Sequence, residues 1–339
     1  MHPERFESIT AQYAKLRVAL VGDVCLDRYL EINPAREEIS IETGLPVHNV
    51  VRVRSQPGAA GTILNNLAAL GVGEIYPVGF AGEDGEGYEL RRALSERAGV
   101  RLDHFLETSQ RRTFTYCKPL VMYPGRAPQE LNRLDSKNWS PTPLPVQESI
   151  VESIRHLATH VHAIILMDQV DVEETGVVTR EVLELIGSLA KAKPELLILA
   201  DSRRGLQNYP SVCFKMNEAE LARLAGTKPK DIDAIQATAR ALAQKQGRQV
   251  FVTMAERGIC GASPNGRADH VPALPVQGEI DIVGAGDAVT ANLTAALAGG
   301  ANLKEALVLA NSAASIVIHQ LGTTGTASVQ QLRHIIFPS

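Results

Sequence analysis

Short aliphatic runs recur along the chain, separated by longer segments in which apolar residues follow a helical period. Four of these runs are compact and rich in aliphatic residues, at residues 18–23, 163–168, 196–201 and 250–254. Runs of this length are typical of parallel strands that are buried on both faces. Because helices and strands alternate, the pattern predicts an α/β protein whose mostly parallel sheet is covered by helices on both sides.

A different pattern occupies residues 30–54. Apolar and polar residues alternate in part of this stretch, such as residues 47–53, which is typical of a small exposed sheet. The proline-rich stretch 137–145 has the composition of a linker, but it fits a loop within one domain equally well. Since α/β folds often reach this length as one unit, we expect a single domain over residues 1–339.

The overall composition is that of an ordinary soluble globular protein, with 45% hydrophobic and 21% charged residues. The formal net charge of −4 gives no reason to expect a nucleic acid or an anionic membrane as a partner. The N-terminus lacks the apolar core of a signal peptide, and no run has the roughly 18 apolar residues of a membrane helix, so we expect a cytoplasmic protein. Four widely spaced cysteines are predicted to be buried, reduced thiols: Cys25, Cys117, Cys213 and Cys260.

The strongest candidate for chemistry is a turn before a helix, Gly284-Ala285-Gly286-Asp287. Two glycines let the backbone turn tightly with its N–H groups exposed, and the helix that follows points the positive end of its dipole at the same spot. The turn therefore suits an anion, and Asp287 could take a proton from a hydroxyl beside that anion. An ordinary helix start, with Asp287 as a cap, explains these residues alone equally well.

The longer string from Asp281 to Asp287 resembles the Asp-x-x-Gly-Ala-Gly-Asp signature of the ribokinase-like (PfkB) sugar kinases. Other motifs of that family recur in the same order over roughly residues 16–333. The resemblance implies a ribokinase-like three-layer α/β/α fold with a small β lid inserted within about residues 28–56 and 108–135, and a homodimer formed through the lid strands. It also implies that Asp287 is the catalytic base and that the transferred phosphoryl group is bound by the amides of Gly284, Ala285 and Gly286.

Two aspartates follow the first predicted strand. Asp23 and Asp27 lie just beyond the run at residues 18–22, where ligand groups commonly lie in α/β proteins. Two carboxylates in a solvated turn are the alternative. The resemblance favours a substrate site, because kinases of this family hold sugar hydroxyls with an aspartate at the position of Asp27.

A second turn leads into a helix at residues 57–71 and resembles the family's first signature. The first turn of such a helix offers free N–H groups to a polar ligand. Where the family usually has a second glycine and a sugar-binding asparagine, this chain has Ala59 and Thr62. The resemblance implies that Gly58, Thr62 and Asn66 of this segment bind the substrate, and that Arg133, further along the chain, does so too.

The segment Asn217-Glu218-Ala219-Glu220 resembles the Asn-x-x-Glu motif with which these kinases organise Mg²⁺ and the phosphates, usually through water. Mg²⁺ prefers oxygen ligands and keeps much of its hydration, so Asn217 and Glu220 suit it. Acidic residues that favour the dipole in the first turn of a helix are the alternative. The expected cofactors are ATP and Mg²⁺, and the further nucleotide-binding residues implied by the resemblance are Thr253, Ala255, Gly258, Asp281 and Asn311.

Several basic residues could receive a phosphorylated substrate, because arginine forks match phosphate geometry; most of them are otherwise solvated charges. They are Arg111, Arg112, Lys118, Arg126 and Arg133. Within the family, the heptose-7-phosphate kinases are the most similar subgroup, on residues 22–29, 39–47, 132–135 and 321–323. The expected reaction is ATP-dependent phosphorylation of a sugar hydroxyl, and the favoured acceptor is the anomeric hydroxyl of a heptose 7-phosphate. Another sugar or a nucleoside as acceptor, and a non-catalytic nucleotide- or sugar-binding role on this scaffold, are the alternatives.

Overall fold

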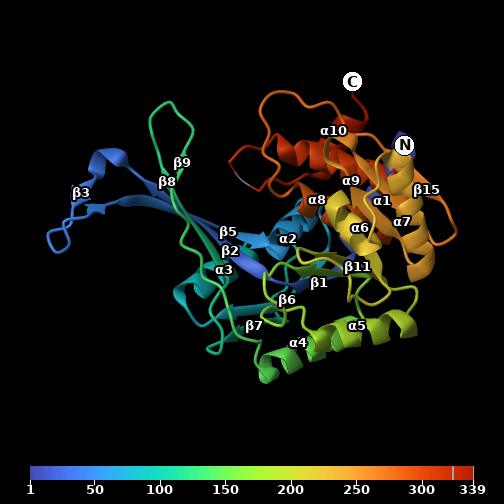
Figure 1. The fold of residues 1–339 in the computed structure, drawn as a ribbon, viewed down its shortest axis with the longest axis horizontal. Coiled ribbons are helices and arrows are strands. Elements are labelled where there is room, and N and C mark those ends of the chain that lie inside the picture. The colour runs from blue at the N-terminus through green and yellow to red at the C-terminus, as the bar shows by residue number, and fades with distance from the viewer. Residues whose placement is uncertain (323, 339) are drawn as a thin grey trace.

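The computed structural model describes residues 1–322 and 324–338, and one large sheet forms the centre of the molecule (Figure 1). Neighbouring strands are parallel except at one edge, where the last two pairings are antiparallel. From that edge, the strand order is β15 (Ala268–Val271), β14 (Ile259–Ala262), β13 (Val250–Thr253), β12 (Cys213–Asn217), β11 (Leu197–Ser202), β10 (Ala163–Asp168), β1 (Arg17–Gly22), β6 (Glu74–Gly82) and β7 (Phe105–Thr108).

Helices cover both faces of this sheet because its strands are apolar on both sides. In β1, Val18 and Leu20 pack into one hydrophobic core, while Ala19 and Val21 pack into the other. The first core includes residues of α1 (Pro3–Thr10), α2 (Ala60–Ala69), α3 (Gly85–Ser95), α8 (Ala285–Ala298), α9 (Leu303–Ile318) and α10 (Val329–Ile336). The second includes residues of α4 (Leu144–Leu157), α5 (Arg180–Ala192), α6 (Glu218–Ala225) and α7 (Ile232–Gln246).

This three-layer arrangement confirms the predicted fold class. The four aliphatic runs that the sequence singled out form β1, β10, β11 and β13. Since parallel strands point the same way, the residues that follow β1, β10 and β11 lie at one edge of the sheet. That edge carries Asp23, Asp168 and Asp201.

A small second sheet extends away from the body (Figure 1). Its strand order is β5 (Val50–Ala59), β2 (Val24–Ile32), β8 (Thr115–Val121) and β9 (Gln129–Glu130). A short hairpin of β3 (Glu38–Ile39) and β4 (Pro46–Val47) lies at its tip. We call these six strands and the loops between them the lid. Because β2 begins two residues after the end of β1, the base of the lid lies directly at the edge of the sheet that carries the aspartates.

The stretch 137–145 forms a loop and the start of α4 within the fold. Arg111 ties this loop to the body, since its guanidinium donates to the carbonyl oxygens of Ser140 and Thr175, at 2.8 Å each. The four cysteines are buried and unpaired, as predicted. Across residues 1–322 and 324–338, no helix is long and apolar enough to span a membrane. Thr323, part of the resemblance at residues 321–323, lies outside the described residues.

Candidate active site

The turn before α8 has a backbone shape that suits glycine. Gly284 caps the helix with φ 84° and ψ −6°, a left-handed conformation that glycine adopts without steric cost. Gly286 and Asp287 lie in the first helical turn, where N–H groups have no acceptor within the helix. Because Asp287 is three residues past the cap and makes no side-chain capping bond to the described residues, helix capping does not account for it.

Two charged side chains meet beneath this turn. Lys215 of β12 places its Nζ 2.7 Å from Asp201 Oδ2 at the end of β11, and both residues are buried. A Cβ added to Gly286 would lie only 3.1 Å from the same Nζ, so the ammonium lies directly against the turn. Lys215 was not among the predicted site residues. A single lysine between apolar residues of a buried strand is the signal that could have identified it.

The surroundings of Asp287 adjust its proton affinity. Burial raises the pKa of Asp287 to about 7; Lys215 acts against this shift, whereas Asp201 and Asp27 add to it. Part of the residue remains accessible to solvent. A carboxylate that exchanges its proton near neutral pH and can be reached from outside is suited to act as a general base.

Asp27 lies in β2 at the base of the lid. Its Oδ1 is 3.4 Å from Lys118 Nζ on the neighbouring strand β8. Burial raises the pKa of Asp27, and Lys118 is the main opposing influence. Gly58 passes so close that an added Cβ would lie 2.6 Å from Asp27 Oδ2. The glycine therefore makes room for the carboxylate.

A group of cations surrounds the ring of Tyr116, which is the β8 neighbour of Asp27. The guanidinium of Arg133 lies 4.4 Å from the centre of that ring and Lys137 Nζ lies 5.6 Å from it. Lys137 and Arg203 both pair with Asp171, at 2.8 and 3.4 Å. We call Arg133, Lys137 and Arg203 the Tyr116 cluster. The sequence predicted Arg133 only, because Lys137 lies in the linker-like stretch and Arg203 in the loop after β11.

One of the basic residues suggested by the sequence does not fit a substrate site. Arg111 exposes 6% of its surface, and its guanidinium is committed to the loop around Ser140 and to Thr175. The suggestion that Arg111 receives a phosphorylated substrate was therefore wrong. Lys118 and Arg133 do lie near Asp27, since both influence its pKa.

Asp23 is buried and holds a loop. Its carboxylate accepts backbone N–H bonds from Gln169, Val170 and Val177, at 2.8, 3.3 and 2.8 Å. The loop that these bonds fix, residues 169–177, carries Asp171 and so supports the Tyr116 cluster. Because Asp23 and Asp27 each expose only 4% of their surface, the alternative of two carboxylates in a solvated turn was wrong. Direct contact between Asp23 and a substrate stays a prediction.

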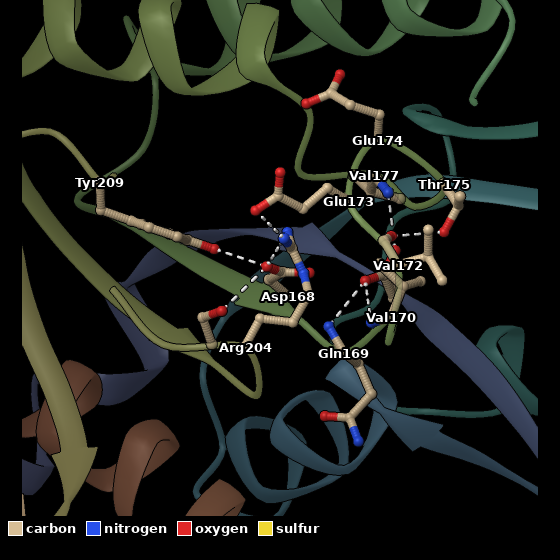
Figure 2. Close-up of polar contacts among 12 residues, drawn as sticks. Asp168, Gln169, Val170, Val172, Glu173, Glu174, Thr175, Val177, Arg204 and Tyr209 are labelled. Carbon is tan, nitrogen blue, oxygen red and sulfur yellow. Dashed lines mark hydrogen bonds and ion pairs between the residues drawn. The ribbon is translucent and has the colours of Figure 1, made fainter. Parts of the chain in front are cut away.

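A network of polar side chains supports the same loop from the other side. Figure 2 shows Arg204 and Tyr209 pointing at Asp168, whose Oδ2 accepts from Arg204 Nη2 at 2.7 Å and from the Tyr209 hydroxyl at 3.1 Å. Arg204 also pairs with Glu173 of the loop, at 3.1 Å. The loop is therefore tied to the ends of both β1 and β10.

The helix α2 contributes two of the predicted substrate residues. Thr62 faces the α8 turn, since a Cβ added to Gly284 would lie 3.4 Å from its methyl carbon. Asn66 is buried; its Nδ2 donates to the carbonyl oxygens of Thr62 and Gly325, and its side-chain oxygen accepts from the backbone N–H of Ala327. Asn66 thus joins α2 to the segment after α9, and its contact with substrate stays a prediction.

A cavity of about 590 Å³ opens beside the α8 turn. This volume is within the usual range of small-molecule sites. Ala285 and Gly286 form part of its wall, and the remaining lining is mostly apolar, with a few polar groups. Of the predicted nucleotide residues, the cavity is lined by Asn217, Thr253, Ala255, Gly258 and Asn311.

Two of these residues shape a tight loop after β13. Ala255 has φ 47°, a conformation that is uncommon for a residue with a side chain. Gly258 has φ 90°, and an added Cβ would collide with the carbonyl group of Val271. Asp281, also predicted to bind nucleotide, is not part of the cavity wall; its Oδ1 accepts from the Val283 N–H at 3.0 Å and so shapes the approach to the α8 turn.

Asn217 and Glu220 form a reciprocal cap at the start of α6. Asn217 Oδ1 accepts from the Glu220 N–H at 2.9 Å, and Glu220 Oε2 accepts from the Asn217 N–H at 2.7 Å. The helix-start alternative is therefore realised in the structure. Across the described residues, no three or more His, Cys, Asp or Glu side chains are grouped as metal ligands. A water-mediated role in Mg²⁺ binding stays a prediction.

The profile of the pfkB family of carbohydrate kinases matches residues 16–330. The chain therefore belongs to this family of carbohydrate kinases, as the resemblance predicted. One relative is the bifunctional protein HldE of Azorhizobium caulinodans, which is 33% identical over 90% of this chain and 61% of the relative. Another is the bifunctional protein HldE of Granulibacter bethesdensis, which is 30% identical over 95% of this chain and 65% of the relative. The chain thus spans less than two thirds of the length of these relatives.

Solved structures show the same fold. Phosphofructokinase-2 from Escherichia coli, in complex with substrates and products, has a TM-score of 0.72 at 18% identity, covering 94% of this chain and 98% of that one. Ribokinase from Arabidopsis thaliana, complexed with ribose and ATP, has a TM-score of 0.65 at 20% identity, covering 96% of this chain and 99% of that one. At these identities the similarity defines the fold and leaves the acceptor open.

Proposed function

We propose that this kinase transfers the γ-phosphoryl group of ATP to the anomeric hydroxyl of a heptose 7-phosphate. The Tyr116 cluster is the observation that carries the proposal. A neutral sugar needs partners for its hydroxyl groups, whereas a phosphate needs cations, and arginine forks match its geometry. The resemblance of residues 22–29, 39–47 and 132–135 to heptose-7-phosphate kinases and the similarity to HldE proteins support the same acceptor.

Asp27 is within electrostatic reach of both the base and the Tyr116 cluster. Asp27 influences the pKa of Asp287, and Arg133 influences the pKa of Asp27. An acceptor held by Asp27 would therefore have one end near the base and the other near the Tyr116 cluster. In this orientation, the hydroxyl to be phosphorylated and the existing phosphate lie at opposite ends of the sugar.

The nucleotide is proposed to bind in the 590 Å³ cavity, with its base between apolar side chains and its phosphates at the α8 turn. Asn311 holds its place in the wall by donating from Nδ2 to the Pro272 carbonyl at 2.9 Å. Thr253, Ala255 and Gly258 would shape the wall near the phosphates, and Asp281 would hold the turn.

The balance of charge near the turn also favours Mg²⁺ as a cofactor. Asp201, Glu220 and Asp287 place three carboxylates around the single ammonium of Lys215, all within electrostatic reach of it. A triphosphate adds further negative charge, so a divalent cation with oxygen ligands is the matching cofactor. Asn217 and Glu220 would hold it through water. When bound, Mg²⁺ neutralises charge on the phosphates.

In the proposed reaction, the oxygen of the sugar hydroxyl attacks the γ-phosphorus while Asp287 takes the hydroxyl proton. The bond between the γ-phosphorus and the β–γ bridging oxygen breaks, and ADP leaves with that oxygen. Of the amides predicted to bind the phosphoryl group, that of Ala285 donates to the Ile282 carbonyl at 3.3 Å. The charge that develops on the transferred group would therefore face the amides of Gly286 and Asp287 in the first helical turn, with the Lys215 ammonium beside them. Catalysis of this kind depends mainly on positioning and on fixed charges. Asp27 would orient the sugar.

The direct test measures ADP release with Mg-ATP across heptoses, hexoses, pentoses, their phosphates and nucleosides. We expect turnover with heptose 7-phosphate and loss of about a thousandfold or more in kcat for Asp287→Asn, because the general base is removed. Turnover that is highest with an unphosphorylated sugar or a nucleoside would contradict the proposed acceptor. If no acceptor is phosphorylated although ATP binds, the chain is a non-catalytic nucleotide-binding protein.

We also propose that the lid pairs with the lid of a second copy. Ile39, Ile41, Leu45 and Val53 expose 60%, 103%, 64% and 46% of their surface, which is unusual for apolar residues gathered in one small lid. Light scattering should give the mass of a dimer for the wild type and of a monomer for Ile41→Asp. A wild type that is monomeric at micromolar concentration would contradict the proposal.

A further inference from the structure

Asp201 is a buried carboxylate that the proposed reaction does not use directly. Its Oδ2 accepts two bonds, from Lys215 Nζ at 2.7 Å and from the Thr290 hydroxyl at 3.0 Å. Thr290 lies one helical turn beyond Gly286 in α8, and its hydroxyl is also 3.1 Å from the Gly286 carbonyl oxygen. Asp201 therefore connects the lysine to the helix that carries the α8 turn.

The strand register explains why these side chains meet. Ala200 of β11 pairs with Phe214 of β12, so Asp201 and Lys215 occupy the next positions of two parallel neighbours. Side chains at paired positions of adjacent strands point to the same face of the sheet. The face that they share is the one covered by α8, and both side chains are buried there.

A lysine ammonium on four rotatable carbons needs a partner to hold one position. Three carboxylates act on Lys215, namely Asp201, Asp287 and Glu220. Of these, Asp201 makes the hydrogen bond, so it fixes the ammonium at its contact with Gly286. Without that bond, the nearest remaining anions would draw the lysine toward the base.

We propose that Asp201 is a positioning residue, which holds Lys215 against the α8 turn so that the ammonium meets the γ-phosphate of ATP instead of pairing with Asp287. This inference rests on the proposed kinase function, because it assigns the γ-phosphate to the α8 turn. It adds two consequences. Recognition of ATP over ADP depends on a residue that does not touch the nucleotide, and Asp287 stays free to accept the proton of the sugar.

The test measures the affinity of the protein for ATP and for ADP, each with Mg²⁺, by titration calorimetry. Asp201→Asn keeps the shape of the side chain and removes its charge. We expect Asp201→Asn and Lys215→Met each to bind ATP about tenfold more weakly, which is the usual effect of losing one charge-assisted hydrogen bond. The affinity for ADP should change by less than about twofold.

The matched control is Thr290→Val, which removes one hydrogen bond to Asp201 and keeps the ion pair. It should leave the ratio of ATP affinity to ADP affinity unchanged.

The double variant Asp201→Asn/Lys215→Met decides whether Asp201 acts through the lysine. If it does, the two effects on ATP binding do not add, and the double variant binds ATP as Lys215→Met does. Additive losses, or an equal loss of ATP and ADP affinity in Asp201→Asn, would show a general structural role and overturn the inference. Thermal unfolding of each variant shows whether it is folded at the temperature of the titration.

Steady-state kinetics provide a second measurement. Asp201→Asn should raise KM for ATP and lower kcat, while KM for the sugar stays within about twofold of the wild type, because Asp27 and the Tyr116 cluster are unchanged. An increase in KM for the sugar alone would overturn the inference. A wild type that binds ATP more tightly than ADP but phosphorylates no acceptor would overturn the proposed kinase function, while the binding titrations still decide the role of Asp201.

Discussion

The two ends of the proposed active site are built from different kinds of structure. At the phosphoryl-transfer end, Asp201, Lys215 and Asp287 come from two adjacent strands and one helix. Asp201 and Lys215 form a buried ion pair, and both act electrostatically on Asp287. At the sugar end, the Tyr116 cluster comes from loops, and its three side chains expose between 24% and 53% of their surface. From this difference we predict that the body of the fold fixes the reaction, while loops around the lid select the acceptor.

The largest expected effect is a change of acceptor preference on mutation at the sugar end. Lys137→Met removes a cation whose partner Asp171 remains, so a phosphate there loses an attraction and gains a repulsion. We expect kcat/KM for heptose 7-phosphate to fall by about ten- to a hundredfold, with little change for unphosphorylated acceptors. Kinetics with heptose and heptose 7-phosphate, measured side by side, check this outcome.

The control for Lys137→Met is Lys245→Met. Lys245 is an exposed cation in the last turn of α7, away from the proposed site, and its replacement changes the net charge by the same amount. It should leave both acceptors unaffected. Equal losses for the two acceptors in Lys137→Met would mean that the residue stabilises the loop at Asp171 and does not select the phosphate.

The next largest expected effect is the pH dependence of the reaction, which tests the phosphoryl-transfer end. Asp287 must be deprotonated to accept a proton, and its pKa is raised to about 7, chiefly by burial. As the pH falls below that value, the deprotonated fraction of the unliganded protein falls, so kcat/KM should decrease by about tenfold per pH unit and level off above about pH 8. The measurement is kcat/KM between about pH 5.5 and pH 9. An activity that stays constant down to pH 5.5 would mean that a base with an ordinary carboxylate pKa, or none, limits the reaction.

The two ends also differ in how much of them the sequence revealed. The α8 turn and the strand ends are local patterns: glycines, a helix start, and aliphatic runs that end in Asp. Such patterns fix the backbone within a few residues, so the fold and the position of Asp287 could be predicted. The role of Asp23 could not, because its three hydrogen-bond donors lie near residue 170, far along the chain.

The Tyr116 cluster could not be predicted from the sequence either, because it too depends on contacts between distant segments. Lys137 and Arg203 are separated by 66 residues and meet only because both pair with Asp171. No spacing in the sequence carries that information, and solvated charges in loops look alike until the loops are placed. At Asn217 and Glu220 the local pattern was clear but had two meanings. The same two residues form a helix cap and fit a family motif, so the sequence left both interpretations open.

The smallest expected effect lies at the junction between the two ends. Ala59 is the last residue of β5, directly before α2, and it has φ 53° and ψ −121°, a conformation suited to glycine. Ala59→Gly relieves strain of about 1–3 kcal/mol and costs about 0.5–1 kcal/mol in unfolded-state entropy, so the free energy of unfolding should rise by about 1 kcal/mol. Urea unfolding at neutral pH measures this change.

The matched control for Ala59→Gly is Ala69→Gly, at the other end of α2. Ala69 is the last residue of that helix, so glycine there brings the entropy cost without any relief of strain and should lower the free energy of unfolding by about 0.5–1 kcal/mol. If both variants are destabilised alike, Ala59 carries no strain in the protein. If Ala59→Gly is more stable and its preference for phosphorylated acceptors is unchanged, the junction affects stability alone, and acceptor choice stays with the Tyr116 cluster.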